Sequence, residues 1–192
     1  MLLPVIGWGF SPIEFSVTSP NYDNSEDATA TFADKSIGTA DGARVVACHL
    51  FISNTATAAC TIGGIAATKS ILDSHHVVFA APVPTGTTAS IVVTSHGGDE
   101  EFPAELLGVW RLLRAGLVVA DFAIGTSPTL DVPANGIIIA DSDLAANSWS
   151  GVDLVATGDE TSYAARIFPA AETNHAVSFS GADVVTFSLP HA

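Results

Sequence analysis

Two aspartates in the segment GIIIADSDL, residues 136–144, have the spacing of a carboxylate pair. If this segment is a strand, Asp141 and Asp143 project from one face, because side chains alternate between the two faces of a strand. Such a pair binds Ca²⁺, acts as acid and base, or simply faces solvent. Asp141 and Asp143 are therefore the candidate calcium ligands of the chain, and we expect no other metal or cofactor.

The histidines His75 and His76, which follow Asp73, are the next residues whose types suit a metal ion. Adjacent residues on a strand point to opposite faces, so the two rings would be poor partners for one ion. The chain has no H-E-x-x-H motif, no paired C-x-x-C motif and no G-x-S-x-G motif. The sequence thus nominates no catalytic residue, and we expect a protein that is not an enzyme.

Cys48 and Cys60 are the two cysteines of the chain. If the segments around them form a hairpin that turns at Asn54, the two lie opposite one another, because they are equidistant from the turn. Cross-strand neighbours come close enough for a disulfide. A cytoplasmic origin favours reduced thiols in the core instead. Reduced thiols, an intrachain disulfide and an interchain bond all stay open.

Three aromatic side chains are candidates for binding or assembly. Trp149, in NSWSG, is expected on a loop, where it either stacks on a sugar ring or caps the end of the core. Trp8 and Phe10 lie in the apolar N-terminal run MLLPVIGWGF. An apolar run on a soluble chain should be covered, so we expect Trp8 and Phe10 to contact a neighbouring subunit.

The elements that must position these residues are short β-strands, because runs of β-branched and apolar residues alternate with Gly, Pro, Asn and Asp. Glycines at five expected turns, in Asp41-Gly42, Gly63-Gly64, Thr85-Gly86, Gly97-Gly98 and Asn135-Gly136, suit positive φ. Helical spacing also fits ELLGVWRLL, although its neighbours favour a strand. The expected strands cover residues 13–17, 28–32, 44–52, 59–64, 65–72, 76–83, 89–95, 105–113, 136–144, 152–157, 163–170, 176–181 and 183–189.

This pattern predicts an all-β fold, an antiparallel β-sandwich of jelly-roll-like Greek-key type. The turn and strand at 135–139 resemble those at 41–47, which indicates either two similar halves or a chance likeness among strand-rich segments. A chain of 192 residues suits one domain. Within it, residues 1–40 hold an N-terminal attachment segment and the first strands, and residues 41–192 hold the sandwich.

Composition excludes several classes of partner. The 20 acidic and 6 basic residues give a net charge of −14, which repels nucleic-acid backbones. No apolar stretch is long enough to span a membrane, and the N-terminus lacks the features of a signal peptide. We therefore expect no nucleic-acid or membrane partner, and synthesis in a cytoplasm. Charged residues make up only 14% of the chain, which suits a surface that neighbouring subunits cover.

The segments RVVACHLFISN, CTIGGIAAT, VVFAAPVPTGTTASIVVT and LLGVWRLL, between residues 44 and 113, carry a resemblance to virion structural proteins of tailed bacteriophages. In the second half, TLDVPANGIIIADSDL and DVVTFSL resemble the matching segments of the same proteins. The resemblance covers most of the chain from about residue 41. It rests on strands and turns, and it carries over no catalytic residue.

The resemblance implies a jelly-roll-like, non-enzymatic component of a virion, such as a capsid decoration, head-fibre, neck or tail protein. It would be made in the bacterial host cytoplasm, would bind other virion proteins and itself, and would attach through its N-terminal segment. The alternative is a carbohydrate- or receptor-binding module at a fibre or tail tip. Trp149 and the pair Asp141 and Asp143 motivate that alternative.

Overall fold

In a computed structural model of the chain, regular structure consists of β-strands alone over the residues described, which are 13–19, 23–25, 27–97, 104–142, 148–157, 161–179 and 184–192. The expected antiparallel β-sandwich is confirmed. The described part contains no helix long and apolar enough to cross a membrane. The strands are β1 (Glu14–Ser19), β2 (Asp23–Ser25), β3 (Thr29–Ser36), β4 (Arg44–Phe51), β5 (Ala59–Ile62), β6 (Ile65–Ala66), β7 (Thr68–Ile71), β8 (His76–Pro82), β9 (Thr88–Thr94), β10 (Ala104–Leu113), β11 (Asp121–Gly125), β12 (Thr129–Val132), β13 (Gly136–Ser142), β14 (Trp149–Ser150), β15 (Asp153–Thr157), β16 (Ser162–Phe168), β17 (Glu172–Ala176), β18 (Ser178–Phe179) and β19 (Val184–Leu189).

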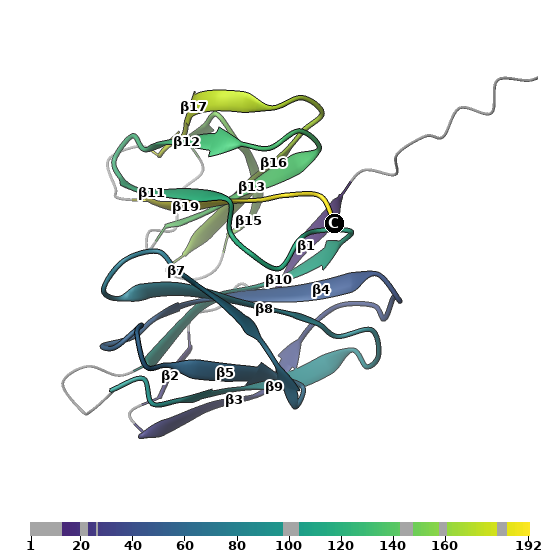
Figure 1. The fold of residues 1–192 in the computed structure, drawn as a ribbon, viewed down its shortest axis with the longest axis vertical. Coiled ribbons are helices and arrows are strands. Elements are labelled where there is room, and N and C mark those ends of the chain that lie inside the picture. Colours follow the sequence, from purple (N-terminus) through teal and green to yellow (C-terminus); the bar gives the residue numbers. More distant parts are fainter. Residues whose placement is uncertain are drawn as a thin grey trace, which may run out of the picture.

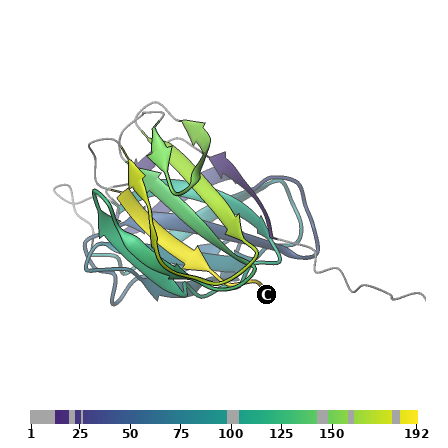
Figure 2. The ribbon, with the colours of Figure 1, turned by 90° about the horizontal axis from the view of Figure 1, so that it is seen from above.

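The strands form a stack of layers (Figure 1). A four-stranded sheet, in the order β3-β9-β5-β6, lies at one end of the stack. Next comes a six-stranded sheet in the order β1-β10-β4-β8-β7, with β2 added beside β10. A five-stranded sheet in the order β11-β19-β13-β16-β15 packs on its other face, and the two-stranded ribbon β12-β17 lies beyond it. Figure 2 shows the green and yellow strands of the five-stranded sheet lying over the blue and teal layers below.

The central strands β4, β8 and β10 of the six-stranded sheet are buried on both faces, which explains their nearly continuous apolar sequences. On β4, Val46 and Cys48 point into the core shared with the four-stranded sheet, which we call the lower core. Val45 and Ala47 point into the core shared with the five-stranded sheet, which we call the upper core. A strand with a packed layer on each side has no face for polar alternation, so its sequence reads as one apolar run.

Strand β13 is buried in the same two-sided manner within the five-stranded sheet. Ile137 and Ile139 belong to the upper core, whereas Ile138 and Ala140 pack beneath the β12-β17 ribbon. β4 and β13 therefore face one another across the upper core, and any polar residue on their facing sides is held between two sheets.

The predictions of local structure are confirmed in part. ELLGVWRLL is part of strand β10, as expected. β2, which is not among the expected strands, pairs with β10. β11, β12, β14 and β17 were not expected either; β11, for example, forms an edge of the five-stranded sheet. β1 and β3, both among the first 40 residues, pair with β10 and β9 and so belong to the sheets.

Turn geometry follows the glycines at some positions only. Gly63 and Gly64 both have positive φ in the tight turn between β5 and β6, as expected. Before β13, however, the positive φ belongs to Asn135 instead of Gly136. Gly136 serves a different purpose, since a Cβ there would lie 2.8 Å from the carbonyl oxygen of Pro133. Close backbone approach, rather than φ, requires glycine at this position.

Candidate functional site

A chain of hydrogen bonds runs from the five-stranded sheet into the six-stranded sheet at one end of the upper core. Asp141 Oδ2 on β13 lies 2.8 Å from His49 Nδ1 on β4. His49 Nε2 lies 3.1 Å from His76 Nδ1 at the start of β8. We call these three residues the polar chain. His49 is completely buried and Asp141 is 4% exposed, so these two side chains are shielded from bulk solvent.

The strand registers place these residues together. His49 follows Val45 and Ala47 on the face of β4 that points into the upper core. Asp141 follows Ile137 and Ile139 on the facing side of β13 in the same way. Alternation along each strand thus turns both polar side chains inward, where they must satisfy one another.

A turn before β8 positions the third member. Asp73 Oδ1 accepts hydrogen bonds from the backbone N–H groups of His75 and His76, at 2.7 and 2.6 Å. His75 then stacks on Phe51, with ring centroids 5.4 Å apart, whereas His76 turns to His49. The two adjacent histidines diverge, as their sequence positions predict, and only His76 joins the polar chain.

The donors in the polar chain follow from its chemistry. A carboxylate can only accept, so Asp141 holds the proton of His49 on Nδ1. Burial of the imidazole, and the neighbouring His49, lower the pKa of His76 to about 4. His76 is therefore neutral at neutral pH, and a single proton lies between His49 Nε2 and His76 Nδ1.

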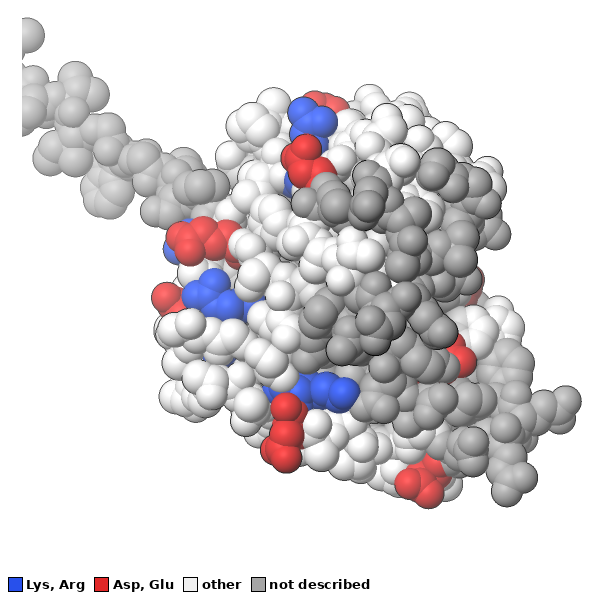
Figure 3. All heavy atoms as spheres, turned by 180° about the vertical axis from the view of Figure 1, so that it is seen from behind, with Lys and Arg blue, Asp and Glu red and all other residues white. Residues whose placement is uncertain are grey.

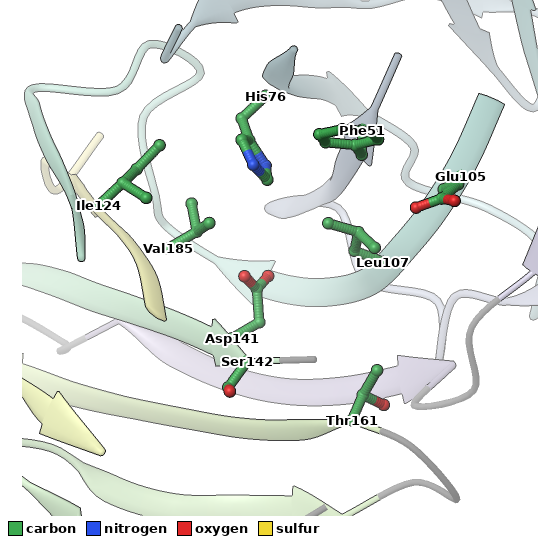
Figure 4. A pocket seen from close by; sticks show the side chains of 9 residues that line it. All are labelled: Phe51, His76, Glu105, Leu107, Ile124, Asp141, Ser142, Thr161 and Val185. Carbon is green, nitrogen blue, oxygen red and sulfur yellow. The ribbon is translucent and has the colours of Figure 1, made fainter. Parts of the chain in front are cut away.

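The polar chain ends at a pocket of about 320 Å³, a size that suits a small ligand. In Figure 4, His76 and Asp141 point toward the same space from opposite sides, and Glu105 reaches it from β10. Its described lining consists of Phe51, His76, Glu105, Leu107, Ile124, Asp141, Ser142, Thr161 and Val185. The pocket thus combines an apolar wall with two acidic side chains, Glu105 and Asp141.

Tyr163 fixes one wall of the pocket. Its hydroxyl donates a hydrogen bond to the Leu107 carbonyl oxygen and accepts one from Thr161 Oγ1 at 2.9 Å. Burial raises the pKa of Tyr163, so the phenol stays protonated and can donate. Gly108 leaves room for the ring, because a Cβ there would lie 2.8 Å from Tyr163 Cε1. β16 and β10 are thereby joined across the upper core beside the pocket.

The calcium prediction is only partly covered by the structure. Asp141 is buried with His49, whereas Asp143 lies outside the described residues. Over the described ranges, no group of three or more His, Cys, Asp or Glu side chains is placed to hold a metal ion. Binding of Ca²⁺ at Asp141 and Asp143 stays a prediction. His49 was not predicted as a site residue, although it is a lone histidine in the apolar strand RVVACHLF.

The cysteines meet, but not in the hairpin that their spacing suggested. β4 pairs with β10 and β8, whereas β5 pairs with β6 and β9 in the four-stranded sheet. Cys48 and Cys60 instead face one another across the lower core as free, buried thiols. A hydrogen bond with Cys60, together with burial, raises the pKa of Cys48 well above its usual value. Such a thiol is a poor nucleophile at neutral pH.

The aromatic candidates have different positions. Trp149 lies in the short strand β14, not on a loop, and its ring centroid is 4.7 Å from that of Phe179. The indole is partly buried and packs against the core beneath the β12-β17 ribbon, which is the capping role. Sugar stacking by Trp149 stays a prediction. Trp8 and Phe10 lie outside the described residues.

Four large apolar side chains are exposed among the described residues, and they come from neighbouring elements. Ile71 is on β7, Val118 precedes β11, and Phe122 and Ile124 share the outer face of β11. The backbone N–H of Val119 donates to Ser70 Oγ at 3.0 Å, which holds this loop against β7. We call Ile71, Val118, Phe122 and Ile124 the apolar strip; it borders the pocket at Ile124.

Comparison of the chain with models of protein families, with curated proteins and with solved structures found no match.

Proposed function

We propose that this protein is a non-enzymatic structural component of a tailed-bacteriophage virion, which assembles with itself and with other virion proteins. The apolar strip is the observation that supports this proposal most. Exposed large apolar groups that gather on one side of a protein are typical of protein–protein interfaces. In this proposal the strip is covered in the assembled particle, and the N-terminal segment with Trp8 and Phe10 provides a second attachment.

The edge strand within the strip adds to this support. β11 is the end strand of the five-stranded sheet, and among the described strands it pairs on one side only, with β19. Exposed, apolar edge strands invite pairing with another chain unless charge or a covering element protects them. On β11, Phe122 is 40% exposed and Ile124 is 37% exposed. A neighbouring subunit that covers β11 would bury both side chains.

The sparse charge of the surface agrees with the same proposal. On the described part of the face shown in Figure 3, the blue and red groups are small and lie among white areas. Depletion of charged residues is a feature of the cores of protein interfaces. A surface of this kind would lose little solvation energy when other subunits cover it.

Incorporation into particles tests the proposal. Tagged protein carrying Phe122→Ser and Ile124→Ser would be produced during phage growth, and the tagged protein in gradient-purified particles would be quantified. We expect incorporation to fall at least tenfold because the buried apolar contact is lost. Thr29→Ala with Thr31→Ala, on the edge strand β3, is the matched control. Wild-type incorporation of the β11 variant, with circular dichroism confirming its fold, would contradict the role of the strip.

Removal of residues 1–12 tests the second attachment separately. The truncated protein should keep the melting temperature of the full chain and be absent from particles. If neither the truncation nor the β11 variant lowered incorporation, the assembly proposal would fail.

A ligand-binding role at a fibre or tail tip is the second candidate, and the pocket beside the polar chain favours it. A glycan array probed with and without Ca²⁺ tests this role, with Trp149→Ala and Asp141→Asn as variants. Glycan binding that depended on either residue would favour the ligand-binding role over a purely structural one.

A further inference from the structure

The pocket presents hydrogen-bond acceptors and negative charge. Glu105 and Asp141 are acidic, and the described lining contains no lysine or arginine to balance them. Asp141 accepts one hydrogen bond from His49, yet a carboxylate offers about four acceptor sites. A ligand that fits this chemistry must be rich in donors and positively charged.

His76 does not oppose a cation. Its ring is neutral at neutral pH, and its Nδ1 is occupied by the contact with His49. The positive charge that a protonated histidine would bring to the pocket is therefore absent. The polar chain thus keeps the centre of the pocket suitable for a positive group.

A bare metal ion does not fit the described groups. Divalent ions need several oxygen or nitrogen ligands within about 2.0–2.6 Å, and no described group of three such residues is placed to hold one. The acidic residues come from different sheets, Glu105 from β10 and Asp141 from β13. The space between them is bounded by Phe51, Leu107, Ile124 and Val185. An apolar wall with separated carboxylates suits a cation that carries a hydrocarbon stem.

We propose that this pocket binds a primary ammonium group on a short aliphatic chain, as in an alkylamine or the side chain of lysine. The ammonium group donates to Glu105 and to the Asp141 side of the pocket, and the methylene groups lie against Leu107, Ile124 and Val185. The face of the Phe51 ring adds an attractive surface for a cation. This site does not depend on the assembly proposal, since a free amine can occupy it in the isolated protein.

The test is a calorimetric titration of the full-length protein at pH 7 with n-pentylamine, n-pentanol and pentanoate. These probes share one chain length and differ in the head group. We expect n-pentylamine to bind at least about tenfold more tightly than n-pentanol, since a hydrogen bond to a charged group is worth a factor of this size or more. We expect pentanoate to bind more weakly than n-pentanol. Equal affinity for the three probes, or no binding of n-pentylamine, would overturn the proposal.

Two variants locate the site. Glu105→Gln keeps the shape of the side chain and removes its charge, and should weaken n-pentylamine binding about tenfold. Glu172→Gln, on β17 and outside the pocket lining, is the matched control and should leave binding unchanged. If both variants weakened binding equally, the effect would be one of net charge, and the pocket would be refuted as the site.

A spectroscopic measurement covers the case in which Glu105→Gln fails to fold. In the wild-type protein, saturating n-pentylamine should shift the imidazole resonances of His76 more than those of His191, which lies outside the pocket lining. An unperturbed His76 would overturn the proposal. Nα-acetyl-lysine amide distinguishes the two sources of the ligand: binding of this compound points to a lysine of a partner protein, whereas binding of n-pentylamine alone points to a free amine.

Discussion

The lower core and the upper core are built on the two faces of one sheet, yet they differ in chemistry. In the lower core, Cys48 of β4 meets Cys60, and the cluster around them is apolar. In the upper core, the next residue, His49, meets Asp141 and His76. Adjacent residues of β4 thus take part in a buried apolar contact on one face and in a polar chain that leads to a pocket on the other.

This difference indicates that the two cores serve different purposes. An apolar core stabilises through burial and tolerates changes that keep its volume. A buried polar chain must keep all its partners, because each unpaired group costs free energy. The upper core therefore tolerates fewer substitutions than the lower core, and the pocket at its open end is where we expect specific binding.

Removing the carboxylate of the polar chain should give the largest effect. Asp141→Ala leaves His49 buried without its partner, and we expect a loss of about 3 kcal/mol in the free energy of unfolding. Cys48→Ala, its counterpart in the lower core, should cost only about 1 kcal/mol, because a small apolar group is lost. Urea denaturation of both variants measures the two values. Equal losses would mean that the two cores do not differ in this way.

A methyl group at Gly108 should perturb the upper core to a smaller extent. Gly108→Ala places a Cβ against the Tyr163 ring and should destabilise the fold by about 2 kcal/mol through overpacking. Gly42→Ala is the control, because a Cβ at Gly42 meets nothing within 4 Å. We expect the control to change stability by less than about 0.5 kcal/mol. Thermal unfolding followed by circular dichroism would detect the difference, and unchanged stability of Gly108→Ala would contradict the packing at Tyr163.

The smallest expected effect is on the pH dependence of stability. The pKa of His76 is lowered from 6.5 to about 4, so below pH 6.5 the unfolded chain binds a proton that the folded protein does not. The free energy of unfolding therefore decreases as the pH falls from about 6.5 to 4. Because the ring is partly exposed, we expect a contribution of about 1 kcal/mol, or a few degrees in Tm. The free energy of unfolding of His76→Gln should lack this pH dependence. A pH profile identical to that of the wild-type protein would show that His76 does not cause it.

Much of the fold could be predicted from the sequence, because strands buried on both faces, such as β4 and β13, have distinctive apolar runs. The strands that were missed are short or polar: β17, ETNHA, has little apolar character, and β11 and β12 are short. The hairpin that would place Cys48 opposite Cys60 does not form, because both edges of β4 are occupied, by β10 and β8. Spacing along the chain does not reveal which strands take those edges.

The polar chain could be predicted only in part. Asp141 was identified from its carboxylate, and His76 was considered as a ligand, but His49 was overlooked. The contact between His49 and Asp141 spans residues far apart in the chain and arises from the stacking of two sheets. Strand alternation gives the face on which each side chain lies, but it does not give the sheet that packs on that face.

The most direct test of the polar chain is the titration of its outer member. In long-range ¹H–¹⁵N spectra of the imidazole groups, His76 should be neutral at pH 7 and should titrate with a midpoint near pH 4. That midpoint requires the burial and the His49 contact seen in the upper core. A midpoint near 6.5, the value of an unperturbed histidine, would show that His76 is solvated and that the polar chain does not form.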